Sequence, residues 1–119
     1  MPRIAPEIFR QRLLIEGYYA RPAVDEEVIR AYFDTITAGL GLRTYGDPIV
    51  HKTSGQGRPE NEGYDAFVPL IDSGIYVCAW SGPRFASVIL YTCAAFDEAE
   101  AVAITRRFFE IDEYSTASF

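Results

Sequence analysis

Three apolar segments joined by two short polar turns occupy the middle of this 119-residue chain. They run from Tyr64 to Asp72, from Ile75 to Trp80 and from Phe85 to Ala94, with Ser73–Gly74 and Ser81–Arg84 between them. Segments of this length, rich in β-branched and aromatic residues and bounded by turn-forming residues, are typical of strands. Strands separated by so few residues pair in opposite directions, because a parallel crossover needs a dozen residues or more. The sequence therefore predicts an antiparallel sheet built around these hairpins.

The flanking segments predict two more strands and two helices. Arg12–Ala20 is a β-rich run, and Asp47–Lys52 is a shorter one. From Asp25 to Leu40 apolar residues recur every three or four positions, which is the helical period, and Asp25 is placed to cap the helix. Asp97 is placed in the same way before a second helical segment, EAEAVAITRRFF. The acidic tail from Glu110 is expected to be loose or to form a short final strand.

The order of these elements predicts an α+β fold. We expect a two-layer sandwich in which two helices cover one face of the antiparallel sheet. The length suits a single domain, residues 1–119. Thr53–Gly63 is a polar, glycine-rich loop without periodicity, and it is the predicted flap. Because the strands carry more apolar surface than two helices would cover, we also expect a homodimer.

Charge and composition exclude several classes of protein. The formal net charge is −6, whereas a nucleic-acid partner needs clustered Lys and Arg. No apolar run approaches the length of a membrane span, no basic amphipathic helix suits a membrane surface, and the N-terminus lacks the layout of a signal peptide. We therefore expect a cytoplasmic protein with no nucleic-acid or membrane partner. Cys78 and Cys93 lack metal-site spacing, so no metal is predicted.

From Asp72 onward the sequence resembles the prokaryotic S-adenosylmethionine decarboxylases. That family carries Glu-Ser-His, a few residues, His-Thr-Trp-Pro-Glu, and then a strand that ends in Thr-Cys-Gly. The stretch DSGIYVCAWSGPRFASVILYTCA aligns with this pattern without a gap, with Asp72–Ser73 on Glu-Ser, Cys78 on the second His, Trp80 on the Trp and Cys93 on the Cys. Upstream, RLLIEGYYARPAV is similar to the family's first strand, with Glu16 on its Glu.

The resemblance implies a pyruvoyl enzyme that works as a homodimer with its sheets packed face to face. In the family, the Ser attacks the carbonyl of the preceding acidic residue, the chain is cut, and the Ser becomes an N-terminal pyruvoyl group. The ketone of that group accepts electrons when CO₂ leaves the substrate. Carried over, the chain cuts itself between Asp72 and Ser73, Ser73 supplies the pyruvoyl cofactor, and Cys93 reprotonates the product. The candidate catalytic residues are thus Ser73, Cys93, Cys78 and Asp72.

Other positions depart from the family pattern. The His after the Ser is Gly74, the processing His is Cys78, and a Ser that assists processing is Asp65. The Pro-Glu that helps to hold the nucleoside is replaced by Ser81–Gly82, and Thr53 stands where an aromatic residue stacks on adenine. The adenosyl pocket is therefore expected to be altered, while Ser73 and Cys93 are retained.

These departures leave the substrate and the activity open. The substrate is expected to be S-adenosylmethionine-like or a smaller, basic amino acid that would meet acidic side chains. The candidate substrate-binding residues are Asp65, Trp80, Glu16, His51 and Glu62. A second hypothesis is a non-processing paralogue that keeps the fold as a small-molecule binding or regulatory module, and a third is an unrelated α+β domain. Read without the resemblance, Glu62 is a solvated loop residue, His51 is a surface residue at a strand end, Trp80 packs in the core or at an interface, and Tyr76 serves in packing.

Overall fold

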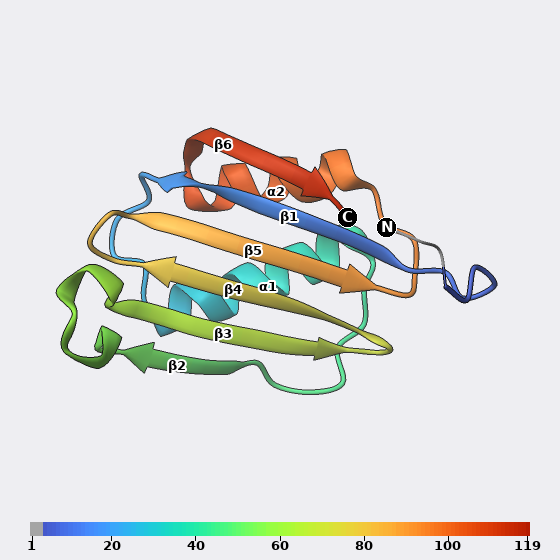
Figure 1. Ribbon diagram of the computed structural model, residues 1–119, viewed down its shortest axis with the longest axis horizontal. Coiled ribbons are helices and arrows are strands. Elements are labelled where there is room, and N and C mark those ends of the chain that lie inside the picture. The colour runs from blue at the N-terminus through green and yellow to red at the C-terminus, as the bar shows by residue number, and fades with distance from the viewer. Residues whose placement is uncertain (1–3) are drawn as a thin grey trace.

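The structure, a computed structural model, describes residues 4–119, so the first three residues of the predicted domain lie outside it. Within this range one six-stranded antiparallel sheet has the order β2-β3-β4-β5-β1-β6. The strands are β1 (Gln11–Tyr19), β2 (Ile49–Thr53), β3 (Gly63–Leu70), β4 (Ser73–Trp80), β5 (Phe85–Thr92) and β6 (Ile111–Ser118). Helices α1 (Glu26–Leu40) and α2 (Glu98–Phe109) lie on one face of the sheet (Figure 1), and two 3-10 turns, η1 (Gly55–Gly57) and η2 (Pro59–Asn61), follow β2.

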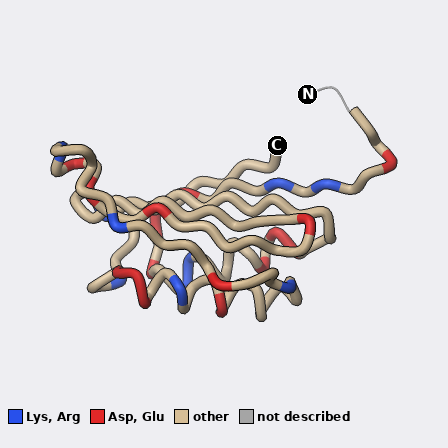
Figure 2. The backbone as a smooth tube through the Cα atoms, turned by 90° about the horizontal axis from the view of Figure 1, so that it is seen from below, with Lys and Arg blue, Asp and Glu red and all other residues tan. Residues whose placement is uncertain are grey.

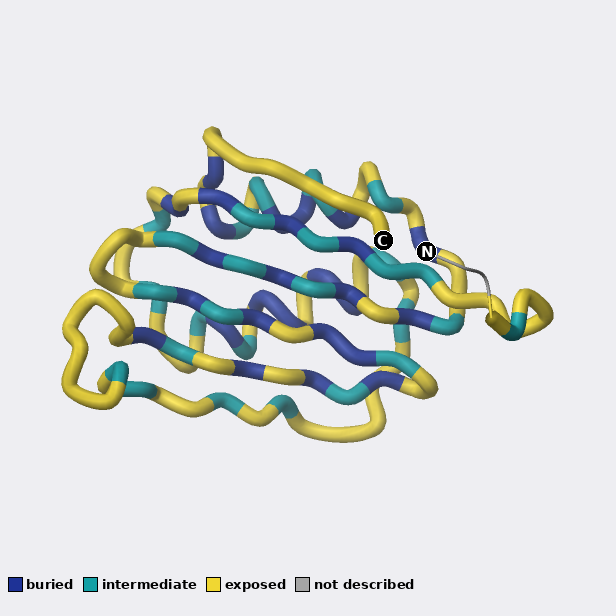
Figure 3. The backbone as a smooth tube through the Cα atoms, viewed as in Figure 1, coloured by how far each residue is buried: buried dark blue, intermediate teal, exposed yellow. Residues whose placement is uncertain are grey.

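The helices and the sheet form the two layers that the sequence predicts (Figure 2). Because side chains alternate between the faces of a strand, every second residue of the central strands is buried beneath the helices (Figure 3). The opposite side, called here the open face, has no helix over it within residues 4–119. The α+β sandwich is confirmed. Its core is formed by Leu13, Ile15, Val68, Ile75, Val77, Val88 and Leu90 from the sheet and by Ile29, Tyr32, Phe33, Ile36, Ile104 and Phe109 from the helices.

Both helices begin at the aspartates that the sequence marks as caps. The Asp25 carboxylate accepts a hydrogen bond from the Val28 backbone N–H at 3.0 Å, and Asp97 does the same for Glu100 at 3.1 Å. These contacts satisfy backbone donors that the first helical turn leaves free. At the other end of α1, Gly41 has φ +67°, the left-handed conformation in which glycine commonly ends a helix.

The hairpin between β3 and β4 turns earlier than predicted. The sequence places the turn at Ser73–Gly74, but both residues belong to β4, and Leu70 pairs with Ser73 across a turn made of Ile71 and Asp72. Asp72 has φ +56°, a left-handed conformation that Asp tolerates better than most residues. Gly74 is required for close packing, since a Cβ there would lie 2.5 Å from Cε2 of Phe67.

The acidic tail forms a complete strand, which the sequence leaves as one of two alternatives. β6 pairs with β1 in antiparallel register, from Leu13 opposite Ser118 to Tyr19 opposite Ile111. Only Ile111 of this strand is buried, so backbone pairing rather than apolar burial holds it in place. In residues 4–119 no helix is long and apolar enough to cross a membrane.

Candidate active site

Ser73 and Cys93 meet at the end of the sheet where β3 turns into β4. Ser73 begins β4, and Cys93 directly follows β5, the antiparallel neighbour of β4. The backbone N–H of Cys93 donates a hydrogen bond to Oγ of Ser73 at 3.0 Å. Both residues are half-buried. The contact fixes the position of the serine oxygen next to the residue that the resemblance makes the proton donor.

These two residues line a pocket of about 360 Å³ together with Asp72. The pocket therefore brings together three of the four predicted catalytic residues, and we call it the Ser73 pocket. Its volume is near the small end of the range for ligand sites, about 300–1,000 Å³. The remaining lining residues are Gly41, Leu42, Arg43, Leu70, Ile71 and Ala94.

Cys78, the fourth predicted catalytic residue, lies elsewhere. It is an odd number of positions along β4 from Ser73, so its side chain belongs to the open face. Its Sγ lies 3.2 Å from Oδ1 of Asp65 and 3.2 Å from the hydroxyl oxygen of Tyr76. A thiol has a single hydrogen, so when it donates to Asp65 the Tyr76 hydroxyl donates to the sulfur. Tyr76, which the sequence assigns to packing, is thus part of a hydrogen-bonded chain.

These contacts keep the Cys78 thiol and the Tyr76 hydroxyl protonated near neutral pH. Burial raises the pKa of Cys78, the hydrogen bond from Tyr76 opposes that rise, and Asp65 adds to it. The hydrogen bond with Cys78, followed by burial, raises the pKa of Tyr76 to about 12. Only the thiolate can react or accept a proton. Because its pKa is raised, Cys78 stays largely a protonated thiol near neutral pH and is a weak base there. It is therefore a poor chemical substitute for the histidine that the family carries at this position.

Cys78 also belongs to a row of polar residues that crosses the open face. The strand register places Asp65 beside Cys78, Cys78 beside Ser87, and Ser87 beside Glu16. The Ser87 hydroxyl donates to Oε2 of Glu16 at 2.8 Å. The register thus aligns four of the predicted site residues, which are scattered in the sequence. The complete row, called the polar row below, is His51, Asp65, Cys78, Ser87, Glu16 and Ser115.

Trp80 and Glu62 lie at the opposite end of the sheet from Ser73. Trp80 packs on Phe85, with ring centroids 5.8 Å apart. It lines a pocket of about 520 Å³ with Asp65 and residues of the glycine-rich loop, whereas Glu62 lines another pocket of about 650 Å³. Seven steps along β4, at about 3.3 Å each, put Trp80 roughly 23 Å from Ser73. Within one chain, the predicted substrate-binding residues therefore do not reach the Ser73 pocket.

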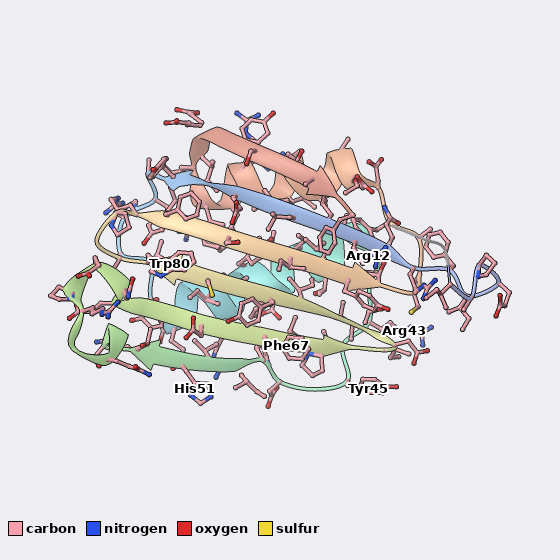
Figure 4. The ribbon with its side chains drawn as sticks, viewed as in Figure 1. Arg12, Arg43, Tyr45, His51, Phe67 and Trp80 are labelled. Carbon is pink, nitrogen blue, oxygen red and sulfur yellow. The ribbon has the colours of Figure 1, made fainter. Side chains whose placement is uncertain are left out.

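Arg43 is the charged residue of the Ser73 pocket that sequence reasoning misses. It lies in the connection between α1 and β2, and this connection runs beside the β3–β4 hairpin. The backbone N–H of Ile71 donates to the Arg43 carbonyl at 3.3 Å, and that of Tyr45 donates to the Pro69 carbonyl at 3.0 Å. Figure 4 shows Arg43 at the hairpin end of the sheet, and Trp80 and His51 toward the other end. No local motif marks Arg43, because only tertiary pairing brings it to the site.

A two-layer sandwich that presents an acid–Ser bond beside a Cys has the architecture that the resemblance implies. The family model for S-adenosylmethionine decarboxylase matches residues 11–119, so the chain belongs to this family. Its structure is similar to the crystal structure of the adenosylmethionine decarboxylase from Aquifex aeolicus VF5, with a TM-score of 0.74 over 94% of this chain and 89% of that chain. The two are 16% identical, which shows the common fold and a divergent member. No curated protein matches the chain in sequence.

Proposed function

We propose that this chain is a pyruvoyl-dependent decarboxylase that cuts itself between Asp72 and Ser73. The observation that carries the proposal is the Cys93 N–H···Oγ contact to Ser73, in a pocket that also contains Asp72. A serine oxygen fixed at the scissile bond and a thiol beside it are the two groups that processing and reprotonation need.

The self-cleavage uses the atoms of Asp72 and Ser73 together with water. The Ser73 oxygen bonds to the Asp72 carbonyl carbon, the C–N bond breaks, and the hydroxyl proton passes to the nitrogen, which gives an ester. Loss of the Cα proton of Ser73 expels the Asp72 carboxylate. Water then displaces the nitrogen as ammonia and leaves a ketone at position 73.

The residues of the pocket fit this group. Ser73 already contacts the Cys93 backbone, and Leu42, Leu70 and Ala94 add apolar side chains to the walls. The pyruvoyl group supplies an electron sink for the loss of CO₂ from an amino acid. Cys93 is a free thiol and can hold a proton beside the reacting centre. We expect the enzyme to work in the cytoplasm, where thiols stay reduced.

The proposed substrate is S-adenosylmethionine-like or a basic amino acid. Asp65 and Trp80 line one pocket together with Arg58, and a carboxylate and an indole ring are both groups that can bind a cation. Glu16 adds a second carboxylate to the same face. Within one chain these residues lie far from the Ser73 pocket, so their contact with a substrate bound there would need a second copy of the chain.

The open face supports a homodimer. Exposed apolar residues lie on both sides of the polar row, and apolar side chains gathered on one face are of the kind that marks a protein interface. Nε of Arg12, on the same face, is buried without a hydrogen-bond partner within residues 4–119. A second copy packed against this face would cover the apolar side chains and bring acceptors to Arg12. The exposed residues are Tyr18, Ile49, Phe67, Tyr76 and Tyr91, with exposed fractions between 39% and 54%.

Intact-mass spectrometry of the freshly purified, untagged protein tests the proposal, with Ser73→Ala as the control. We expect two fragments divided between Asp72 and Ser73, the second carrying the mass of a pyruvoyl terminus, and one uncut chain for the control. Light scattering on the same samples is expected to give the mass of a dimer of the complete sandwich. A wild-type chain that stays uncut would eliminate the mechanism.

An uncut chain would favour the second candidate, a non-processing paralogue that binds a small molecule. The observation behind this alternative is the replacement of the family's processing residues by Cys78 and Asp65, which hydrogen-bond to each other on the open face. Calorimetric titration of the Ser73→Ala chain with S-adenosylmethionine and with basic amino acids distinguishes the two candidates. A ligand bound by an uncut wild-type chain identifies a binding module.

A further inference from the structure

We propose that Arg43 is a positioning residue for self-cleavage, in that it stabilises the negative charge that develops on Asp72. The inference rests on the proposed function. It begins from the Ser73 pocket, in which Arg43 lines the same walls as Asp72 and Ser73. Arg43 is the one cationic residue among those walls, and the bond to be cut is the peptide bond between the other two.

The backbone around Arg43 is connected to the turn that contains the scissile bond. The Arg43 carbonyl accepts a hydrogen bond from Ile71, and Thr44 bridges to Leu70. Asp72 follows directly and has φ +56°. The turn and the Arg43 segment therefore form one unit, which keeps the Arg43 backbone beside the turn that contains the scissile bond.

The Arg43 side chain is available for this role. Within residues 4–119 one ion pair is closer than 4.0 Å. It joins Nε of Arg30 to Oε2 of Glu26 at 3.1 Å, on the surface of α1. Arg43 makes no ion pair within this range and its side chain is exposed. A guanidinium carries five N–H donors and stays charged at any pH in the normal range. It can therefore bind oxygen atoms that become negative during the reaction.

Both charge-forming steps of the proposed cleavage fall on Asp72. When Ser73 attacks, the Asp72 carbonyl oxygen becomes anionic, and when the ester is expelled Asp72 gains a full carboxylate. The side-chain carboxylate of Asp72 lies next to these charges and repels both. A cation that interacts more strongly with these developing charges than with the precursor lowers the barrier.

The need for such a cation follows from what the chain lacks. In the family pattern a His assists processing, but here its position is occupied by Cys78. That thiol faces the open side of the sheet, contacts Asp65 and Tyr76, and has a raised pKa. Arg43 supplies positive charge at the Ser73 pocket from a different part of the chain.

The test follows cleavage in time rather than the activity of the finished enzyme. Newly synthesised chains from a cell-free reaction are quenched in acid at intervals, and intact mass gives the cleaved fraction. We expect Arg43→Met to slow cleavage roughly 10- to 100-fold, below the effect of removing one oxyanion-hole donor. Arg43→Lys should recover part of the rate, and guanidinium ion added to Arg43→Met should recover part of it as well. The matched control is Arg107→Met, an exposed arginine of α2 that does not line the Ser73 pocket, and it is expected to cleave like the wild type.

The outcomes separate the two proposals. A wild-type chain that never cleaves overturns the proposed function and this inference together. A wild-type chain that cleaves, with Arg43→Met cleaving at the same rate, overturns the inference alone. Circular dichroism monitors folding, and a slow variant that neither Lys nor guanidinium ion restores shows a structural role and also overturns the inference.

Discussion

The β3–β4 hairpin carries two regions of different character. At its turn, Asp72 and Ser73 share a pocket with Cys93. These three residues align with the family's acid–Ser pair and its cysteine. Midway along the same hairpin, Asp65 and Cys78 face each other where the family carries a serine and a histidine. The first region lies at the sheet end and the second on the open face. The comparison teaches that the residues proposed as scissile bond and proton donor match the family pattern, whereas the residues that would assist them differ from it.

The largest effect is expected from a substitution in the first region, at Cys93. Cys93→Ala should leave self-cleavage intact but lower the rate of CO₂ release by roughly 10²- to 10⁴-fold, because the product carbon loses its positioned proton donor. The measurement is CO₂ release from the substrate that the wild type accepts. Cys78→Ala is the control and is expected to keep most of the rate. Equal losses in the two variants would contradict the assignment of the proton donor.

The next effect concerns Gly74, which adjoins Ser73 and lies under the ring of Phe67. Gly74→Ala should lower the free energy of unfolding by about 1–3 kcal/mol, because the new Cβ would lie 2.5 Å from Cε2 of Phe67. Urea denaturation in a Ser73→Ala background keeps the chain in one piece. Adding Phe67→Leu should restore part of the loss. If this second change brings no recovery, the crowding argument is wrong.

A smaller effect is expected in the polar row. Ser87→Ala removes the 2.8 Å hydrogen bond to Glu16 and should lower the free energy of unfolding by about 0.5–1.5 kcal/mol. Glu16→Gln keeps an acceptor and is expected to cost less. Both are measured by urea denaturation in the uncut background. A larger loss for Glu16→Gln than for Ser87→Ala would show that Glu16 makes its main contact elsewhere.

The smallest effect sharpens the chemical contrast between the two cysteines. Asp65 raises the pKa of Cys78, so Asp65→Asn lowers that pKa and increases the thiolate fraction at any pH below it. Alkylation of Cys78 by iodoacetamide at pH 8 should become roughly 2- to 5-fold faster, in a Cys93→Ala background that leaves one thiol. Mass spectrometry measures the rate. An unchanged or slower rate would refute an electrostatic link between Asp65 and Cys78.

Local signals in the sequence predict the helix ends and the buried faces. Asp25 and Asp97 cap the helices as expected, and alternation identifies the strand residues that face the helices. Alternation does not determine where the β3–β4 hairpin turns. A turn at Ser73–Gly74 and one at Ile71–Asp72 differ by an even shift in register, and both leave the same residues beneath the helices. The observed turn depends on contacts such as Phe67 over Gly74, which no local pattern encodes.

The residues of the candidate site also differ in whether the sequence alone can predict them. The acid–Ser bond and Cys93 are recognisable in the sequence because they match a family pattern in fixed order. Arg43 and the hydrogen bond of Tyr76 are not, since each depends on how separate segments pair in three dimensions. The β6 strand shows the same limit, because its pairing with β1 involves backbone atoms that every residue carries.

The strand order gives a cut chain one further property. The piece that ends at Asp72 contributes β1, β2 and β3, and the piece that begins at Ser73 contributes β4, β5 and β6. Because β1 lies between β5 and β6, the pieces interdigitate and meet at β3–β4, β5–β1 and β1–β6. They cannot separate without opening the sheet. Folding of one precursor chain is unimolecular, whereas reassembly of a cut chain joins two pieces, so the cut adds a concentration-dependent step to recovery from denaturant.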